Sequence, residues 1–199
     1  MNFKKLMFVF VFICISIFFI IYYIFSSFGN NKFRNQNEIV DNILNKFNNY
    51  EANILVTITT NKNENNYEMF QEVSEKNSKT IINSPENIKD MIIEINDNTL
   101  KITNTKINME KIYEEYDGLL NNNLFLNKFA KDCENNNFKF YEKNEKIILE
   151  TILNNNSSTY IKYKELCLDK KTNLPIELIM KDNTKKACIR IIYNDIKIK

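Results

Sequence analysis

The sequence predicts an α+β protein in which an N-terminal transmembrane helix precedes a curved antiparallel sheet with one or two inserted helices. Three observations lead to this prediction. Residues 6–25 contain no charged side chain, residues 36–48 carry apolar residues at helical spacing, and most of the remaining chain alternates apolar with polar residues. An initial helix, many antiparallel strands and a helix midway are the element order of an α+β fold around a single sheet.

The uncharged run at residues 6–25 has the length of a membrane-spanning helix. Twenty residues rising 1.5 Å each cover about 30 Å, the thickness of the hydrocarbon core of a bilayer. Lys4 and Lys5 precede the run, and the positive-inside rule then predicts a cytoplasmic N-terminus and an extracytoplasmic C-terminal domain. The expected anchor residues are Leu6, Phe10, Phe12, Ile15, Phe18, Ile21 and Phe25.

Cleavage as a signal peptide and lipidation at Cys14 are the two alternatives to a retained anchor. A cleaved signal peptide has an apolar core of about 7–15 residues followed by small residues. Here the core is longer, and the first alanine of the chain is Ala52. Lipidation of Cys14 requires small residues before the cysteine, whereas residues 11–13 are Val, Phe and Ile. A retained anchor is therefore favoured over cleavage, and cleavage over lipidation.

The predicted domain organisation follows from this anchor. Residues 1–29 form a short cytoplasmic stub and the anchor, residues 30–37 a polar spacer, and residues 38–199 an extracytoplasmic domain of ordinary single-domain length. The chain from Asn35 onward has 23 basic and 25 acidic residues, because four of the 27 basic residues and none of the 25 acidic ones precede it. This balance argues against nucleic acid as a partner.

The elements of the domain are predicted from periodicity and turn residues. Helices are expected at residues 36–48 and 124–133, while residues 109–116 fit either a helical turn or an irregular crossover. Ser84-Pro85 should end a strand, since proline cannot continue a ladder, and Asn96 to Asn98 should form a hairpin turn. The predicted strands are residues 52–59, 67–73, 79–82, 91–95, 99–103, 138–141, 146–153, 160–169, 175–182 and 187–199.

Missing residue types exclude most enzyme classes. The chain has no histidine and only two glycines, which rules out histidine-based triads, histidine zinc sites and glycine-rich phosphate loops. We predict no catalytic residue, no metal and no cofactor. In the C-terminal meander, Cys167 should lie opposite about Glu177 and Cys188 opposite about Lys181. These strands are separated by a third, so no Cys167–Cys188 disulfide is expected.

Several stretches resemble known families. A helix leading into Tyr50-x-Ala52, together with LCLDKKTNLP at residues 166–175, resembles the LolA-like lipoprotein-carrier fold. An ordered set of further stretches is similar to the clostridial germination lipoprotein GerS and GerS-related proteins: NKN at 61–63 leading to YEMFQ at 67–71, SPENI at 84–88, LKITNT at 100–105 and KIYEEY at 111–116. The resemblance covers most of residues 38–197.

The resemblance implies both a fold and a function. The fold is an open half-barrel whose helices pack on the concave face. The function is that of a spore-envelope protein in the cell or forespore membrane that binds a cortex N-acetylmuramoyl-alanine amidase, with the chemistry done by the amidase. GerS relatives are typically lipoproteins, whereas this chain lacks the lipidation signal. The predicted transmembrane helix would supply the tether instead.

The alternative function is a lipid or lipoprotein carrier that holds acyl chains in the half-barrel. A carrier must leave the membrane with its cargo, so a retained anchor favours the scaffold. Some apolar residues would line either a carrier cavity or an ordinary core: Phe125, Phe129, Ile148, Ile189 and Ile191.

Overall fold

The computed structural model describes residues 40–96, 98–116, 124–135, 138–153 and 160–199. The chain divides into two compact units, Met1–Asn42 and Ile43–Lys199, and the fold below is that of the second unit. The predicted anchor and the spacer lie outside the described residues. No helix among the described residues combines the length and the apolar character needed to cross a bilayer.

A single antiparallel sheet of eleven strands forms the framework of this unit. Its strand order is β6-β5-β4-β3-β2-β1-β11-β10-β9-β8-β7, so the last strand pairs with the first and joins two meanders. The strands are β1 (Tyr50–Thr59), β2 (Glu64–Val73), β3 (Asn77–Ser84), β4 (Met91–Asn96), β5 (Thr99–Asn104), β6 (Met109–Tyr113), β7 (Phe138–Lys143), β8 (Lys146–Ile152), β9 (Tyr163–Asp169), β10 (Pro175–Lys181) and β11 (Ala187–Ile198).

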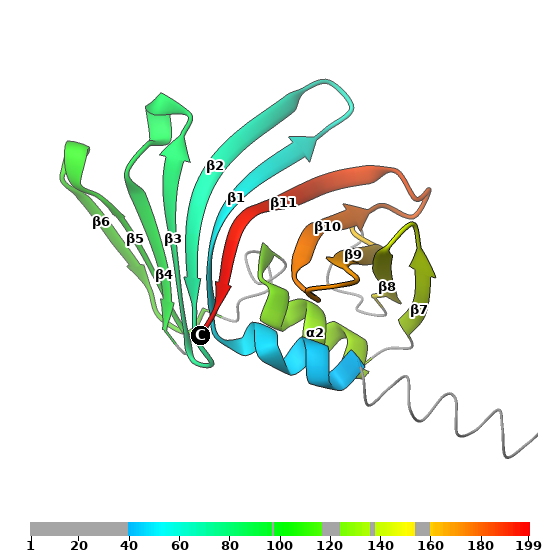
Figure 1. Cartoon of the computed structure of the whole chain (residues 1–199). Helices are drawn as coiled ribbons and strands as arrows, with labels where there is room; N and C mark the ends of the chain where they lie inside the picture. Colours follow the sequence, from blue (N-terminus) through cyan, green and yellow to red (C-terminus); the bar gives the residue numbers. More distant parts are fainter. Residues whose placement is uncertain (1–39, 97, 117–123, 136–137, 154–159) are drawn as a thin grey trace, which may run out of the picture. The chain divides into compact units, whose positions relative to one another are not determined.

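Two short helical segments accompany the sheet. Residues 40–45 are helical and continue into the 3-10 turn η1 (Lys46–Asn48), and α2 (Leu126–Asn135) lies between β6 and β7 in sequence. Two further 3-10 turns are η2 (Glu86–Ile88), which follows Pro85, and η3 (Thr105–Ile107), which links β5 to β6. Figure 1 shows β7–β11 curling around α2.

The face of the sheet that carries α2, called the inner face, forms the core. Strand residues alternate between the two faces, and the inward residues of β1 are Tyr50, Ala52, Ile54 and Val56, all fully or almost fully buried. The apolar side of α2 buries Phe129 completely and Ala130 and Cys133 nearly so. The helix therefore packs as an amphipathic element against an alternating sheet.

The sequence predictions for the fold are confirmed in most elements. Each of the ten predicted strands corresponds to one strand of the sheet, and both predicted helices are present where the structure describes them. The expectation for residues 109–116 was wrong, because Met109–Tyr113 is an edge strand, β6, paired with β5. Its residues are mostly exposed, so the strand has no buried face to create an alternating pattern.

The registers predicted around the cysteines are also correct. Cys167 pairs with Glu177, and Cys188 lies at a bulge beside the pair formed by Lys181 and Ala187. The described cysteines, Cys133, Cys167 and Cys188, are all buried, and Cys167 and Cys188 are free thiols.

Candidate functional site

A buried tyrosine ties the start of α2 to the sheet. The hydroxyl of Tyr50 donates to Oε1 of Gln71 at 3.1 Å and accepts a hydrogen bond from the backbone N–H of Leu126 at 3.4 Å. Tyr50 and Gln71 are both fully buried, and burial raises the pKa of Tyr50 well above its ordinary value. Nε2 of Gln71 and the hydroxyl of the nearby buried Tyr193 have no hydrogen-bond partner.

A partly buried ion pair ties the second turn of α2 to the same face. Lys164 of β9 is completely buried, and its Nζ lies 2.5 Å from Oδ2 of Asp132 on α2. The backbone carbonyl of Asp132 accepts a long hydrogen bond, 3.5 Å, from the hydroxyl of Thr151 on β8. The helix is thus held on the inner face by directional polar contacts as well as by apolar packing.

The residues predicted to line a cavity or core do not all lie on one face. Phe125, Phe129 and Ile191 are buried in the core, and Ile189 is half-buried on β11, two residues from Ile191. Ile148 is half-buried on the opposite face, where its register neighbours are Tyr141 and Cys167. The inner face where α2 lies is therefore filled by packed side chains from the helix and the sheet.

Acidic and cysteine side chains are the candidates for metal binding and nucleophilic chemistry among the described residues. The described residues contain no group of three or more Cys, Asp or Glu side chains placed to hold a metal ion. Burial raises the pKa of the Cys167 thiol, which disfavours the reactive thiolate.

The outer face of the sheet carries a row of charged side chains across seven strands. Glu72 faces Lys79, Lys79 faces Glu94 and Glu94 faces Lys101, each on the next strand. Lys199 bridges the neighbouring carboxylates of Glu51 and Glu72, at 3.1 and 2.7 Å. We call this row the charge ladder, and its members are Lys197, Lys199, Glu51, Glu72, Lys79, Glu94, Lys101 and Glu110.

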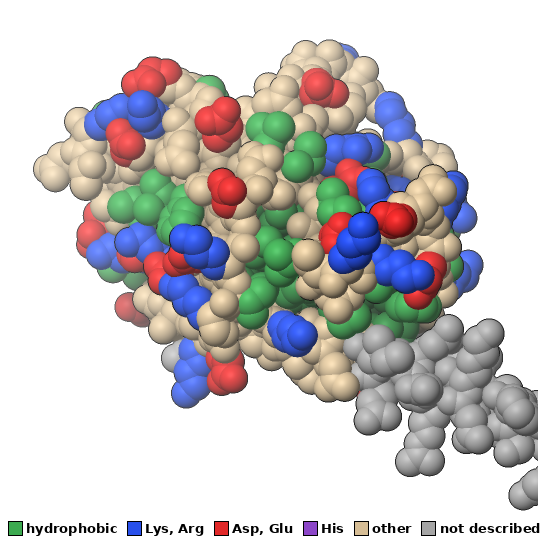
Figure 2. All heavy atoms as spheres, viewed as in Figure 1, with side chains coloured by type: hydrophobic (Ala, Val, Ile, Leu, Met, Phe, Trp, Pro, Cys, Tyr) green, Lys and Arg blue, Asp and Glu red, His purple; other side chains and the backbone are tan. Residues whose placement is uncertain are grey.

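Charge on the described surface is balanced rather than concentrated. Acidic and basic side chains are interspersed on the face seen in Figure 2, and apolar side chains gather near its centre. A groove of about 330 Å³ lies between the β2–β3 turn and the end of β11, but its two lysines, Lys79 and Lys199, already pair with carboxylates of the charge ladder. The groove therefore offers no uncompensated charge to a ligand.

Exposed apolar side chains concentrate at β6 and the turn before it. Ile107 is 68% exposed, Ile112 52% and Tyr113 40%, and these are three of the five large hydrophobic residues that are exposed in the described part of the chain. Tyr141 on β7, at the other edge of the sheet, and Tyr160 are the remaining two.

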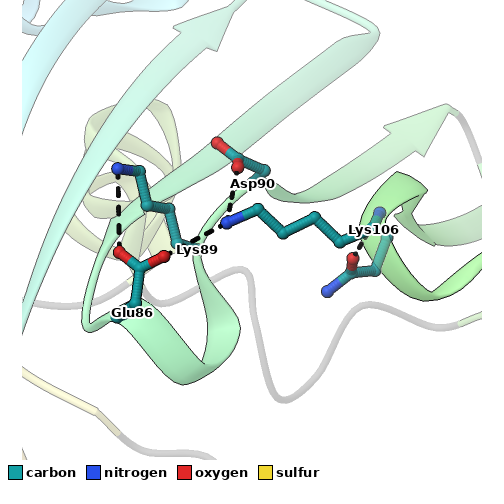
Figure 3. A network of polar contacts seen from close by, with 5 residues as sticks. Glu86, Lys89, Asp90 and Lys106 are labelled. Atoms are coloured by element: carbon teal, nitrogen blue, oxygen red, sulfur yellow. Dashed lines mark hydrogen bonds and ion pairs between the residues drawn. The ribbon is translucent and has the colours of Figure 1, made fainter.

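A network of ion pairs orders the turn that leads into β6. Lys106 of η3 reaches back to Asp90 at 3.1 Å and to Glu86 at 3.3 Å, and Glu86 also pairs with Lys89 at 3.7 Å (Figure 3). The side chain of Asn104 accepts a hydrogen bond from the backbone N–H of Lys106. These contacts connect η3 to the β3–β4 connection and leave the neighbouring Ile107 exposed.

Comparison with known proteins shows the fold of the chain. Neither a scan against models of protein families nor a search of the curated proteins finds a match. Among solved structures, the chain is similar to the GerS lipoprotein of Clostridioides difficile in complex with the CwlD amidase, with 20% identity, 85% of this chain and 95% of that chain covered, and a TM-score of 0.54. This likeness confirms the LolA-like fold and the GerS resemblance that the sequence predicts.

Two further structures extend the comparison. An uncharacterized conserved protein from Thermus thermophilus matches with 9% identity, 83% of this chain and 88% of that chain covered, and a TM-score of 0.55. A LolA superfamily protein from Nitrosomonas europaea matches with 12% identity over 79% of this chain and 92% of that chain, at a lower TM-score of 0.41.

The polar contacts beneath α2 were not predicted from the sequence. Gln71 and Lys164 occupy inward positions of strands, where the pattern calls for apolar residues. An inward polar residue in an alternating strand is the only signal that marks them, and it does not identify their partners.

Proposed function

We propose that this chain is a membrane-anchored, extracytoplasmic binding or scaffold protein without catalytic activity, and that it supports spore cortex modification and germination by binding a cortex amidase. The observation that carries the proposal is the common fold with GerS, whose solved structure is a complex with an amidase. The chain has no histidine, and its described residues contain no group of three or more Cys, Asp or Glu side chains placed to hold a metal ion.

The packing of α2 favours a scaffold over a lipid carrier. Acyl chains in the half-barrel would occupy the inner face, where Phe129 and Leu126 of α2 are already fully buried. Displacing the helix would break the hydrogen bond to Tyr50 and leave the ammonium of Lys164 without its carboxylate. A partner that binds the outer face or an edge of the sheet requires neither change.

The test is reconstitution with a defined amidase. The full chain, purified in a mild detergent because of the predicted anchor, is mixed with the purified N-acetylmuramoyl-alanine amidase expressed during sporulation of the same organism. Light scattering after size exclusion gives the stoichiometry, and calorimetry gives the affinity. We expect a stoichiometric complex with this amidase and none with an amidase of vegetative growth, which is the control.

Mass spectrometry of the same preparation distinguishes the carrier. If the chain retains stoichiometric lipid or lipoprotein and does not bind the sporulation amidase, the scaffold function is wrong and the carrier function replaces it.

A further inference from the structure

The charge ladder ends at an incomplete position on the edge strand. Glu94 lies between lysines of both neighbouring strands, with Lys79 at 3.9 Å on one side and Lys101 facing it on the other. Glu110 of β6 has Lys101 at 2.9 Å on its β5 side. On its other side, no described strand pairs with β6. One more strand beside β6 would bring a residue opposite Glu110, and a basic residue there would continue the alternation.

The backbone of β6 has hydrogen-bonding groups that point away from the sheet. Asn96 and Thr99 close a two-residue hairpin loop, and such a closing pair exchanges both backbone hydrogen bonds. Alternation then directs the backbone groups of residues 100, 102 and 104 toward β6, where they pair with residues 113, 111 and 109. The N–H and C=O groups of the remaining residues of β6, Glu110 and Ile112, therefore point outward.

The other edge of the sheet is better protected. Natural edge strands are guarded by charged side chains, lysine above all. β7 carries exposed Lys139 and Lys143. β6 has a single lysine, Lys111, whose Nζ lies 4.9 Å from the centre of the Tyr113 ring. The edge at β6 thus combines outward backbone groups with exposed apolar side chains.

The residues just after β6 contact the β4–β5 turn. The backbone N–H of Tyr116 donates to the carbonyl of Asn98 in the β4–β5 turn, at 2.6 Å. As far as the structure describes it, the chain after β6 therefore stays beside the β4–β5 turn.

We propose that β6 binds an extended strand of the partner protein by antiparallel strand addition. The partner strand reads apolar–x–basic, with the apolar residue opposite Ile112 and the basic residue opposite Glu110. Backbone bonds to these two residues give the pairing, the apolar side chain covers Ile112, and the basic side chain completes the ladder. This inference rests on the proposed function, for which it specifies the binding surface and the chemistry of the bound segment.

A proline substitution tests the pairing against the proposed amidase. Ile112→Pro removes an outward N–H that no bond within the sheet uses, and proline is tolerated at such edge positions. Ile112→Val retains the N–H and is the matched control. For the full chain we expect the amidase Kd to rise by about ten-fold or more with Ile112→Pro and by less than about three-fold with Ile112→Val.

The outcomes separate the two proposals. If the wild type and Ile112→Pro bind the amidase equally well, the scaffold function stands. The assignment of the binding surface to β6 is then overturned. Circular dichroism of each variant identifies any loss of fold. A wild-type dimer that Ile112→Pro dissociates would assign the edge to a second copy of this chain and would also overturn the inference.

A peptide probe tests the edge without the amidase. The synthetic peptide Thr-Thr-Ile-Thr-Lys-Thr-Thr carries the expected pattern, and the same peptide with Glu in place of Lys is the control. With isotope-labelled full chain in detergent, we expect amide shifts confined to β5 and β6, stronger for the lysine peptide and lost in Ile112→Pro. Equal shifts from both peptides, shifts at β7, or none would overturn the inference. If the lysine peptide binds β6 but the chain does not bind the amidase, β6 remains a strand-binding edge and the scaffold function is refuted.

Discussion

Replacing Tyr50 with phenylalanine isolates the polar contact that holds the start of α2. The substitution removes one oxygen and leaves the apolar ring in place. It also leaves Oε1 of Gln71 and the backbone N–H of Leu126 without their partner in a fully buried position. Tyr193 supplies the matched control, because it is also a buried tyrosine but its hydroxyl has no hydrogen-bond partner.

The two variants should differ clearly in stability. A buried polar group that loses its partner costs about 1–3 kcal/mol, and the 3.4 Å bond to Leu126 is long enough to contribute at the low end. We therefore expect Tyr50→Phe to lower the free energy of unfolding by about 2–3 kcal/mol. Tyr193→Phe loses no hydrogen bond and should change the free energy by less than about 0.5 kcal/mol.

Urea unfolding of the full chain in mild detergent, followed by circular dichroism at pH 7, measures both values. Alkaline pH provides an internal check. Burial raises the folded-state pKa of both tyrosines above the ordinary value of 10.0, so their contribution to stability is complete below that pH and is lost as pH rises toward the folded pKa. Each variant should therefore lose less stability above about pH 10 than the wild type. Equal stabilities of the two variants at pH 7 would refute the role given to Tyr50.

Three more predictions concern other parts of the chain. Asp132→Ala leaves the ammonium of Lys164 buried without its carboxylate and should lower the free energy of unfolding by about 2–4 kcal/mol. Lys164→Met should lower it by less than about 1 kcal/mol. Equal losses for the two variants in urea unfolding would contradict the role of the ion pair. Glu145 has a φ of 58° in the β7–β8 turn, so Glu145→Gly should stabilise the protein by about 1 kcal/mol, measured as an increased midpoint of urea unfolding. The N–H and hydroxyl of Thr172 donate to Asp169 and hold the pKa of that carboxyl below 3.8. Its contribution is therefore present above pH 3.8 and lost as pH falls through the folded pKa, and Asp169→Asn should flatten the stability profile in that acid range; an unchanged profile would contradict it.

Sequence patterning predicted the strands that have one buried face. In β1 the apolar residues alternate with half-exposed ones, and the burial of the strand follows the same period. β6 lacks this signal, since its five residues are almost all exposed and its position depends only on backbone pairing with β5. The turn before it does have a local signal. Asn104 caps η3 and Asn108 adopts a φ of 50°, a conformation that asparagine tolerates better than most residues.

The contacts between residues far apart in the sequence had no comparable signal in the sequence pattern. β1 pairs with β11 from the other end of the chain, and the alternation of each strand is compatible with several neighbours. The contact between Lys164 and Asp132 joins residues 32 positions apart on a strand and a helix. The charge ladder depends on the register of seven strands together. Each lysine lies beside its glutamate only when the neighbouring strands pair in the observed register.

The energetics of the inner face bear directly on the choice between carrier and scaffold. Binding acyl chains there requires α2 to leave, and the gain from new apolar contacts would replace contacts that Leu126 and Phe129 already make. The helix would also abandon the hydrogen bond to Tyr50 and the carboxylate beside Lys164, at a cost of several kcal/mol for an unpaired buried charge. Adding a strand at β6 leaves α2, the hydrogen bond to Tyr50 and the pairing of Lys164 in place. The packing of α2 is therefore compatible with binding at the edge of the sheet and opposes acyl-chain binding on the inner face.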